Sequence, residues 1–227
     1  MLRSPSLAYV APFVIFLGLL ALSRVLLLPP VATQAGFVAL MLLALAVVAR
    51  PVLLAERGKA VRVRHWIPTL ILGVAVFALW IAPDHFFPGY RHFWLFENPL
   101  MGKPESSLPE AARSQPLALW LRAFRAVIIV PVVEELFWRG WLMRWLISLD
   151  FESVPLGAWS AQAFWIVAVL FASEHGAYWD VGLAAGVLYN WWMVRTRSLG
   201  DLILAHAVTN ACLSAYVAWS GRWEYWL

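Results

Sequence analysis

The sequence predicts an all-α protein, a polytopic transmembrane helical bundle of about seven to eight spans. Two properties of the composition lead to this prediction: 63% of the 227 residues are hydrophobic, and only 13% are charged. Soluble domains contain about 45–50% apolar and about 25% charged residues. The third observation is the length of the apolar runs, because a helix that crosses a bilayer needs about 20 apolar residues.

Seven apolar stretches have a length suited to a spanning helix. The expected spans cover residues 7–28, 31–49, 66–82, 117–149, 159–175, 181–196 and 199–219. Between the third and fourth spans, the proline-rich and aromatic segment 83–116 is expected at the membrane interface. The spans leave no room for a separate soluble domain, so residues 1–227 are predicted to form a single integral membrane domain.

The basic residues gather in short connections between the spans. The connection after the second span holds one acid, Glu56, and five basic residues, Arg50, Arg57, Lys59, Arg62 and Arg64. Lys and Arg accumulate in cytoplasmic loops, so this face and the N-terminus with it are expected in the cytoplasm. These loops also explain the net charge of +4, and we expect the partner to be the lipid bilayer and no nucleic acid.

The fourth apolar stretch contains two adjacent acids, Glu134 and Glu135, followed by Arg139. A charged side chain at membrane depth costs about 2.5–3.5 kcal/mol on insertion scales, so such residues indicate a functional site. Glu135 and Arg139 are four residues apart and share a helix face, where they can pair. Glu134 points about 100° away and remains available for other chemistry.

Two further polar clusters interrupt the later spans. Phe171 and His175 lie one helical turn apart, as do His206 and Asn210. A lone intramembrane His near an Asn is often an interhelical hydrogen-bond pair. Three clusters on three helices instead indicate a water-activating site, with a carboxylate base, an imidazole that shares the proton and donors for an oxyanion.

These three motifs, Glu134-Glu135-x-x-x-Arg139, Phe171-x-x-x-His175 and His206-x-x-x-Asn210, resemble those of the CAAX-protease and bacteriocin-processing (CPBP, Abi) family of intramembrane endopeptidases. The resemblance covers about residues 117–215, which it marks as the catalytic core helices. Residues 1–116 then supply the N-terminal spans and the interfacial segment. The ending of the chain also resembles an exosortase-associated branch of CAAX prenyl protease-related proteins.

The resemblance assigns a role to each motif residue. Glu134 and His175 would activate the attacking water, and His206 and Asn210 would stabilise the tetrahedral oxyanion. Glu135 and Arg139 would form a supporting ion pair. The alternative is a divalent metal such as zinc, held by Glu134, His175 and His206 with one position open. We favour the water mechanism without an obligatory metal, since the residues do not follow the His-Glu-x-x-His arrangement.

The function expected from these residues is an intramembrane endopeptidase. It would hydrolyse a peptide bond in a membrane-associated protein or peptide, in a bacterial inner membrane and with a possible link to an exosortase sorting system. Two other classes are alternatives: a non-catalytic membrane scaffold or immunity partner, and, with less support, a proton-coupled transporter with a Glu and His relay. Transporters typically show inverted repeats and broken helices, and the sequence shows neither.

Overall fold

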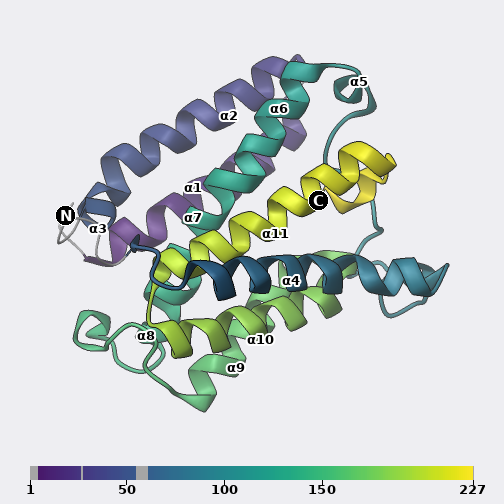
Figure 1. Ribbon diagram of the computed structural model, residues 1–227. Coiled ribbons are helices and arrows are strands. Elements are labelled where there is room, and N and C mark those ends of the chain that lie inside the picture. Colours follow the sequence, from purple (N-terminus) through teal and green to yellow (C-terminus); the bar gives the residue numbers. More distant parts are fainter. Residues whose placement is uncertain (1–4, 27, 55–60, 227) are drawn as a thin grey trace.

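The computed structural model describes residues 5–26, 28–54 and 61–226 and consists of helices joined by short connections (Figure 1). The all-α prediction is confirmed: within these residues, β-pairing is limited to one isolated bridge, between Asn98 and Gly102. The elements are α1 (Pro5–Val25), α2 (Pro30–Ala44), η1 (Leu45–Ala49), α3 (Arg50–Leu54), α4 (Trp66–Phe86), η3 (Tyr90–His92), α5 (Glu110–Arg113), α6 (Pro116–Phe124), η4 (Arg125–Ile129), α7 (Val130–Glu135), η5 (Leu136–Leu142), α8 (Met143–Trp145), η6 (Phe151–Ser153), α9 (Ala161–Ser173), η7 (Gly176–Tyr178), α10 (Trp179–Thr196), α11 (Leu199–Ser220) and η8 (Trp223–Tyr225).

All seven predicted stretches are helical, but in the described part of the chain only five helices are long and apolar enough to cross a membrane. These are Pro5–Val25, Pro30–Leu54, Trp66–Phe86, Pro116–Trp145 and Leu199–Ser220. Five of the described helices thus have the length and composition of a membrane span, against the seven to eight spans that the sequence predicts. The 13-residue α9 is too short, and α10 is less apolar because it carries Asp180, Asn190 and Arg195. The protein is an integral membrane helical bundle.

The helix that carries Glu134 and Glu135 is continuous from Pro116 to Trp145, but its winding changes along its length. Two π-helical segments, η4 and η5, interrupt it on either side of α7. Pro131 explains η4, because proline lacks an N–H and its ring displaces the carbonyl group four residues earlier. π-helical turns are frequent at functional sites, and here the two segments flank the glutamate pair.

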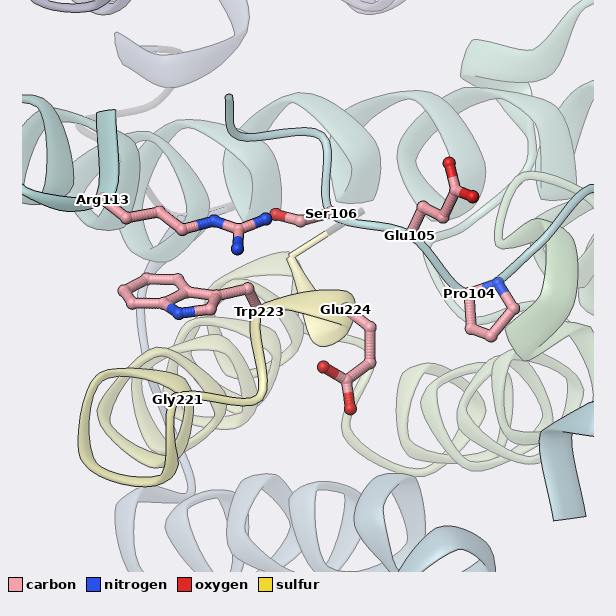
Figure 2. A pocket seen from close by; sticks show the side chains of 7 residues that line it. All are labelled: Pro104, Glu105, Ser106, Arg113, Gly221, Trp223 and Glu224. Atoms are coloured by element: carbon pink, nitrogen blue, oxygen red, sulfur yellow. The ribbon is translucent and has the colours of Figure 1, made fainter. Parts of the chain in front are cut away.

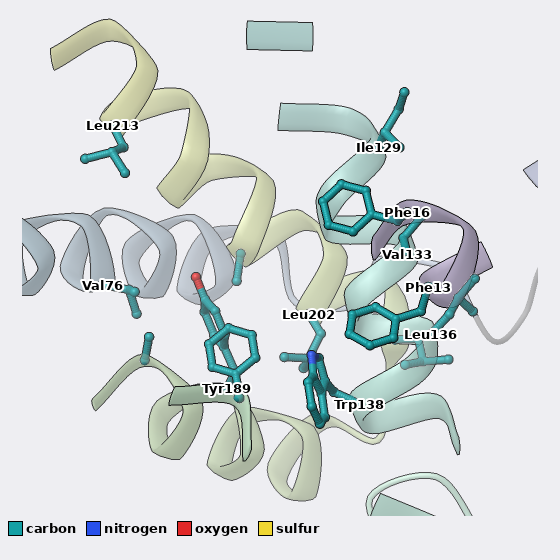
Figure 3. Packing of buried hydrophobic residues seen from close by; sticks show 14 of the residues in the cluster. Phe13, Phe16, Val76, Ile129, Val133, Leu136, Trp138, Tyr189, Leu202 and Leu213 are labelled. Atoms are coloured by element: carbon teal, nitrogen blue, oxygen red, sulfur yellow. The ribbon is translucent and has the colours of Figure 1, made fainter. Parts of the chain in front are cut away.

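The helices form two groups that meet along α11 (Figure 1). In the first group, α1 and α2 pack against α6, α7 and η5; in the second, α4, α9 and α10 pack together. Between them, α11 contacts α4 on one side and η4 and α7 on the other. Figure 3 shows the core between the groups, where residues from α1, α4, α7, η5, α10 and α11 pack: Phe13, Phe16, Val76, Val133, Leu136, Trp138, Tyr189 and Leu202.

The start of α11 is bound to the start of α4. Ser198 caps α11, and its Oγ accepts a hydrogen bond from the Asp201 N–H at 3.2 Å. The fully buried Asp201 carboxylate accepts bonds from the backbone N–H groups of Arg64 and His65, at 2.6 and 3.1 Å, and contacts Nδ1 of His65 at 2.8 Å. Since His65 directly precedes α4, the two helices begin at the same level.

Further along, α4 and α11 approach each other closely at Gly73. A Cβ atom there would lie 2.6 Å from the carbonyl oxygen of Ala205 and 2.7 Å from Cβ of Val208. The Thr209 hydroxyl also donates to the Gly73 carbonyl at 2.9 Å. Gly73→Ala is expected to force the helices apart and to destabilise the protein by about 1–3 kcal/mol, the usual cost of overpacking. Thermal unfolding in detergent measures this loss.

The matched control is Gly36→Ala in α2, where a Cβ atom would meet no heavy atom within 4 Å. Because Gly is a poorer helix former than Ala, this variant is expected to unfold at or slightly above the wild-type temperature. Unfolding of Gly73→Ala at the same temperature as Gly36→Ala would show that the close approach of α4 and α11 is not needed.

The connections lie at two ends of the bundle (Figure 1). The end with α3, the start of α4 and the start of α11 is called the proximal end, and the end with α5 and η8 is called the distal end. The segment between α4 and α6 contains η3 and α5 and, in its described residues, no eighth span. Three residues of the orientation argument, Glu56, Arg57 and Lys59, lie outside the described residues, and which end faces the cytoplasm stays a prediction.

Candidate functional site

The core of the site is a buried triad of charged and polar side chains from two helices. Arg139 donates from its Nη1 to both carboxylate oxygens of Glu135, at 3.1 and 3.2 Å. On the opposite side, Nδ1 of His206 lies 2.9 Å from Oε1 of Glu135. Glu135 and Arg139 are 0% exposed. The structure thus joins the first and third sequence motifs through the Glu135 carboxylate.

A second set of hydrogen bonds fixes the Arg139 guanidinium from α10. Its Nε donates to Oδ1 of Asn190 at 2.8 Å, and its Nη2 donates to the carbonyl of Gly186 at 3.4 Å. Asn190 is fully buried and donates in turn to the Phe164 carbonyl of α9 at 2.8 Å. Sequence reasoning gave Asn190 no part in the site, although a polar amide in an apolar helix is a known signal of interhelical contact.

His175 is held by a backbone contact one turn earlier in α9. Its Nδ1 lies 2.8 Å from the carbonyl oxygen of Phe171. Because a carbonyl can only accept, the proton sits on Nδ1 and leaves the lone pair on Nε2, as a general base requires. Gly182 of α10 makes room for this ring, since a Cβ atom there would lie 3.1 Å from Nδ1 of His175.

The Phe171 ring lies between the second and third motifs. Its centroid is 4.8 Å from that of His175 and 6.2 Å from that of His206, and the Arg139 guanidinium lies 4.6 Å above it. The Tyr189 ring stacks on the imidazole of His206, and the two ring centroids are 5.3 Å apart. The two imidazoles predicted from separate motifs therefore belong to one cluster, packed around an aromatic ring.

Glu134 is buried but stands outside this hydrogen-bonded triad. Its side chain makes no hydrogen bond to the other predicted site residues, and in the described part of the chain its Oε2 has no hydrogen-bond partner. The indole Nε1 of Trp138, further along the same helix, is also buried, and it interacts with the Glu174 carboxylate at the end of α9. The free Glu134 oxygen is a buried acceptor, which a water molecule would satisfy.

Asn210 shares a helix face with His206 but contacts a different element. Its Nδ2 donates to the Ala126 carbonyl of η4 at 2.8 Å, which uses one of its two N–H bonds. The other N–H is available to a ligand. A π-helical segment has carbonyls that do not follow the α-helical pattern, so the winding change at η4 presents this acceptor to α11.

A metal does not fit the arrangement of these side chains. Across the described residues, no three His, Cys, Asp or Glu side chains lie close enough together to hold an ion. Glu135, a potential ligand, is already engaged by Arg139 and His206. The set predicted for zinc, Glu134, His175 and His206, thus gives no basis for a step through a metal.

Arg122 in α6 and Arg125, the first residue of η4, lie on the distal side of the glutamate pair in the same helix. Both are buried, with Arg122 positioned over the Trp226 ring at 5.4 Å and Arg125 over the Phe37 ring at 4.2 Å. A guanidinium above an aromatic face is attracted by its negative π-electron density. The attraction to these rings therefore offsets part of the free-energy cost of burying the two cations inside the bundle.

The connection between α9 and α10 is fixed from the distal end by Arg91. This guanidinium donates to the Ala177 carbonyl at 2.9 Å, to Asp84 at 3.2 Å and to Asp180. Burial alone would lower the pKa of Arg91, but its bonds to Asp180 raise it above the usual value. Burial also raises the pKa of the nearby Tyr178 hydroxyl, so Arg91 stays protonated and Tyr178 stays neutral over the physiological pH range.

Two cavities of the described structure lie at the distal end and not around Glu134. The larger has a volume of about 430 Å³ and is shown in Figure 2. The smaller, of about 270 Å³, is lined by Asp84, Arg91 and Tyr178 among others. Neither is lined by Glu134, His175, His206 or Asn210, so the candidate site lies apart from both cavities.

Comparison with known proteins identifies the segment that carries this site. The family model described as type II CAAX prenyl endopeptidase Rce1-like matches residues 116–212, which is less than half of the chain. The match contains all three motifs and confirms the resemblance drawn from them, but it does not confirm the exosortase-associated branch. Neither the curated proteins nor the solved structures include a match. Residues 116–212 of this chain are therefore similar to the Rce1-like family of CAAX-type membrane proteases.

Proposed function

We propose that this membrane protease is an intramembrane endopeptidase that cleaves a peptide bond in a membrane-associated protein or peptide. The observation that carries the proposal is the contrast between the two adjacent acids. Glu135 is fully engaged by Arg139 and His206, whereas Glu134 is buried with an oxygen that has no partner in the described residues. An acid held in this way can accept a proton from water.

In the proposed reaction, Glu134 and Nε2 of His175 orient a water molecule and take its proton as its oxygen attacks the peptide carbonyl. The carbonyl oxygen becomes an oxyanion, which the free N–H of Asn210 stabilises. His206 adds a second donor in its imidazolium form, with Nδ1–H directed at Glu135 and Nε2–H at the oxyanion. Collapse of the intermediate breaks the C–N bond, and the amine leaves with the proton.

The other roles in this proposal are supportive. Arg139 holds the Glu135 carboxylate in place, and Asn190 positions Arg139. We also propose that the proximal end faces the cytoplasm of a bacterial cell, because Arg50, Arg62 and Arg64 lie in the connection there and basic loops stay on that side. The proposed substrate is a membrane protein or peptide, and the enzyme is proposed to act alongside a protein-sorting system.

The experiment that tests the function compares purified wild type with Glu134→Gln. Both are incubated in detergent with candidate membrane peptides, and cleavage is followed by mass spectrometry. Products that appear with the wild type and not with the variant support the peptidase. Equal cleavage by both would identify a contaminant or a different base. Absence of cleavage, together with one partner that co-purifies with both proteins, would favour a scaffold.

Metal removal provides a separate prediction. Because the side chains do not form a three-ligand group, dialysis against a chelator is expected to leave the rate of cleavage within about twofold of the untreated enzyme. Cleavage rates before and after dialysis, with the metal content measured in parallel, test this. Loss of all activity, restored by zinc, would contradict it and would require a rearrangement of Glu134, His175 and His206.

A further inference from the structure

The larger distal cavity lies at a membrane boundary. Its lining comes from the segment before α6 and from the residues after α11: Pro104, Glu105, Ser106, Arg113, Gly221, Trp223 and Glu224. Both α6 and α11 belong to helices that qualify as membrane spans, so the cavity opens where these two spans end. Its volume of about 430 Å³ is within the range of about 300–1,000 Å³ that small ligands occupy.

Arg113 gives the cavity a cation that needs an anion. Figure 2 shows its side chain along the face of the Trp223 indole, and the guanidinium carbon lies 5.7 Å from the ring centroid. The Arg113 Nε is buried and has no hydrogen-bond partner in the described residues, and no ion pair involves Arg113 there. A guanidinium in this state suits a phosphate, which it can bind through two parallel hydrogen bonds.

The acids around the cavity do not form an ion pair with Arg113 in the described residues. Glu224 is already bound by Arg222, whose Nε donates to its Oε1 at 2.7 Å. Glu105 is exposed at the rim and, within the described residues, makes no ion pair. The cavity thus offers an unpaired cation and an unpaired acid, and a ligand that carries both a phosphate and an ammonium group would satisfy both charges.

The surface below the cavity is suited to acyl chains. On α6, directly after Arg113, Leu117 and Trp120 are 57% and 75% exposed, and at the end of α11 Trp219 is 84% exposed. Tryptophan is enriched at the headgroup level of membranes. A molecule with its polar end in the cavity would therefore extend its apolar part along these side chains into the bilayer.

We propose that the distal cavity is a binding site for a zwitterionic phospholipid. Arg113 binds the phosphate, with Trp223 holding the guanidinium in place, and Glu105 binds the ammonium group of the headgroup. The proposal is independent of the peptidase activity, because none of its residues belongs to the Glu134, His175, His206 and Asn210 set. The segment that connects α4 and α6 would thus have a function of its own, the binding of a lipid headgroup.

Thermal unfolding of delipidated full-length protein in detergent tests the site. The probes are phosphatidylethanolamine, phosphatidylglycerol and inorganic phosphate, each titrated into wild type, Arg113→Gln and Arg113→Lys. Arg195→Gln is the matched control, because Arg195 is exposed at the end of α10, at the proximal end. A ligand that binds the folded state raises its unfolding temperature as its concentration increases.

Phosphatidylethanolamine is expected to stabilise wild type and Arg195→Gln equally. Arg113→Gln should need at least about tenfold more lipid, since hydrogen bonds to a charged group are lost, and Arg113→Lys should be intermediate. Equal stabilisation of Arg113→Gln would overturn the proposal. Inorganic phosphate acting as well as the lipid would show an anion site and overturn the assignment to a lipid. Glu105→Gln tests the second contact. If phosphatidylglycerol stabilised wild type as much as phosphatidylethanolamine does, and Glu105→Gln left the effect of phosphatidylethanolamine unchanged, Glu105 would have no role in binding.

Discussion

Replacing Glu134 by Gln is expected to lower kcat for peptide cleavage by about 10²–10⁴-fold, the contribution that general-base catalysis makes in enzymes. Gln has nearly the same shape as Glu, so it fills the same buried position, but it cannot accept a proton from water. Since the Glu134 carboxylate makes no bond to Glu135, Arg139 or His206, the triad should remain intact. Steady-state kinetics on the identified substrate measure the loss, and thermal unfolding shows that the fold persists.

Glu110→Gln is the control for this variant. Glu110 is an exposed acid in the first turn of α5, at the distal end, and the same chemical change there is expected to leave kcat and KM unchanged. If Glu134→Gln were as active as Glu110→Gln, Glu134 would not be the base. A fall in kcat accompanied by an equal fall in stability would instead mean that Glu134 has a structural role.

Replacing Arg139 by Met is expected to destabilise the protein more than any other single change considered. It leaves the Glu135 carboxylate buried, with His206 as its remaining bonded partner in the described residues, and it removes the donor to Asn190 Oδ1. Breaking a buried ion pair on one side costs about 3–5 kcal/mol. For a chain of this size, that loss lowers Tm by roughly 6–20 °C, measured by thermal unfolding in detergent.

Two companion variants separate charge from packing. Asn190→Leu keeps the ion pair and removes a neutral acceptor, so it should cost about 1–3 kcal/mol. The double variant Glu135→Leu with Arg139→Met removes both charges and should be less destabilised than the sum of its single changes, because groups in one network are not additive. A strictly additive result would show that Glu135 and Arg139 do not interact energetically.

Most of the fold could be predicted from apolar runs alone, because such runs identify helices regardless of their neighbours. The sequence predicts more spans than the five that length and composition identify among the described helices, because an apolar run does not distinguish a lipid-facing helix from one covered by protein. α10 is the example: it packs against α9 and α4 and buries Asn190 completely. An apolar stretch that contains buried polar residues can therefore form a helix inside the bundle as well as a membrane span.

The site could be predicted only where its contacts are local. Spacing of four residues was enough to place Glu135 beside Arg139, and the ion pair is present. The bonds of Arg139 to Asn190, 51 residues away, and of Glu135 to His206, 71 residues away, depend on tertiary packing. The π-helical winding of η4 and η5 also changes which residues share a face, and no spacing rule anticipates it. The catalytic roles of the motif residues stay predictions.

The paired attachment of α4 and α11 determines which half of the protein can admit a peptide. These helices are fixed to each other at the Asp201 contact with His65 and again where Gly73 meets Ala205, so neither can slide or tilt alone. His206 is therefore part of a rigid half. In the proposed enzyme, movement of α1 and α2, which precede the family segment, would open the site toward the lipid without disturbing this half. Substitutions in these two helices are then expected to change the choice of substrate more than the rate of the chemical step.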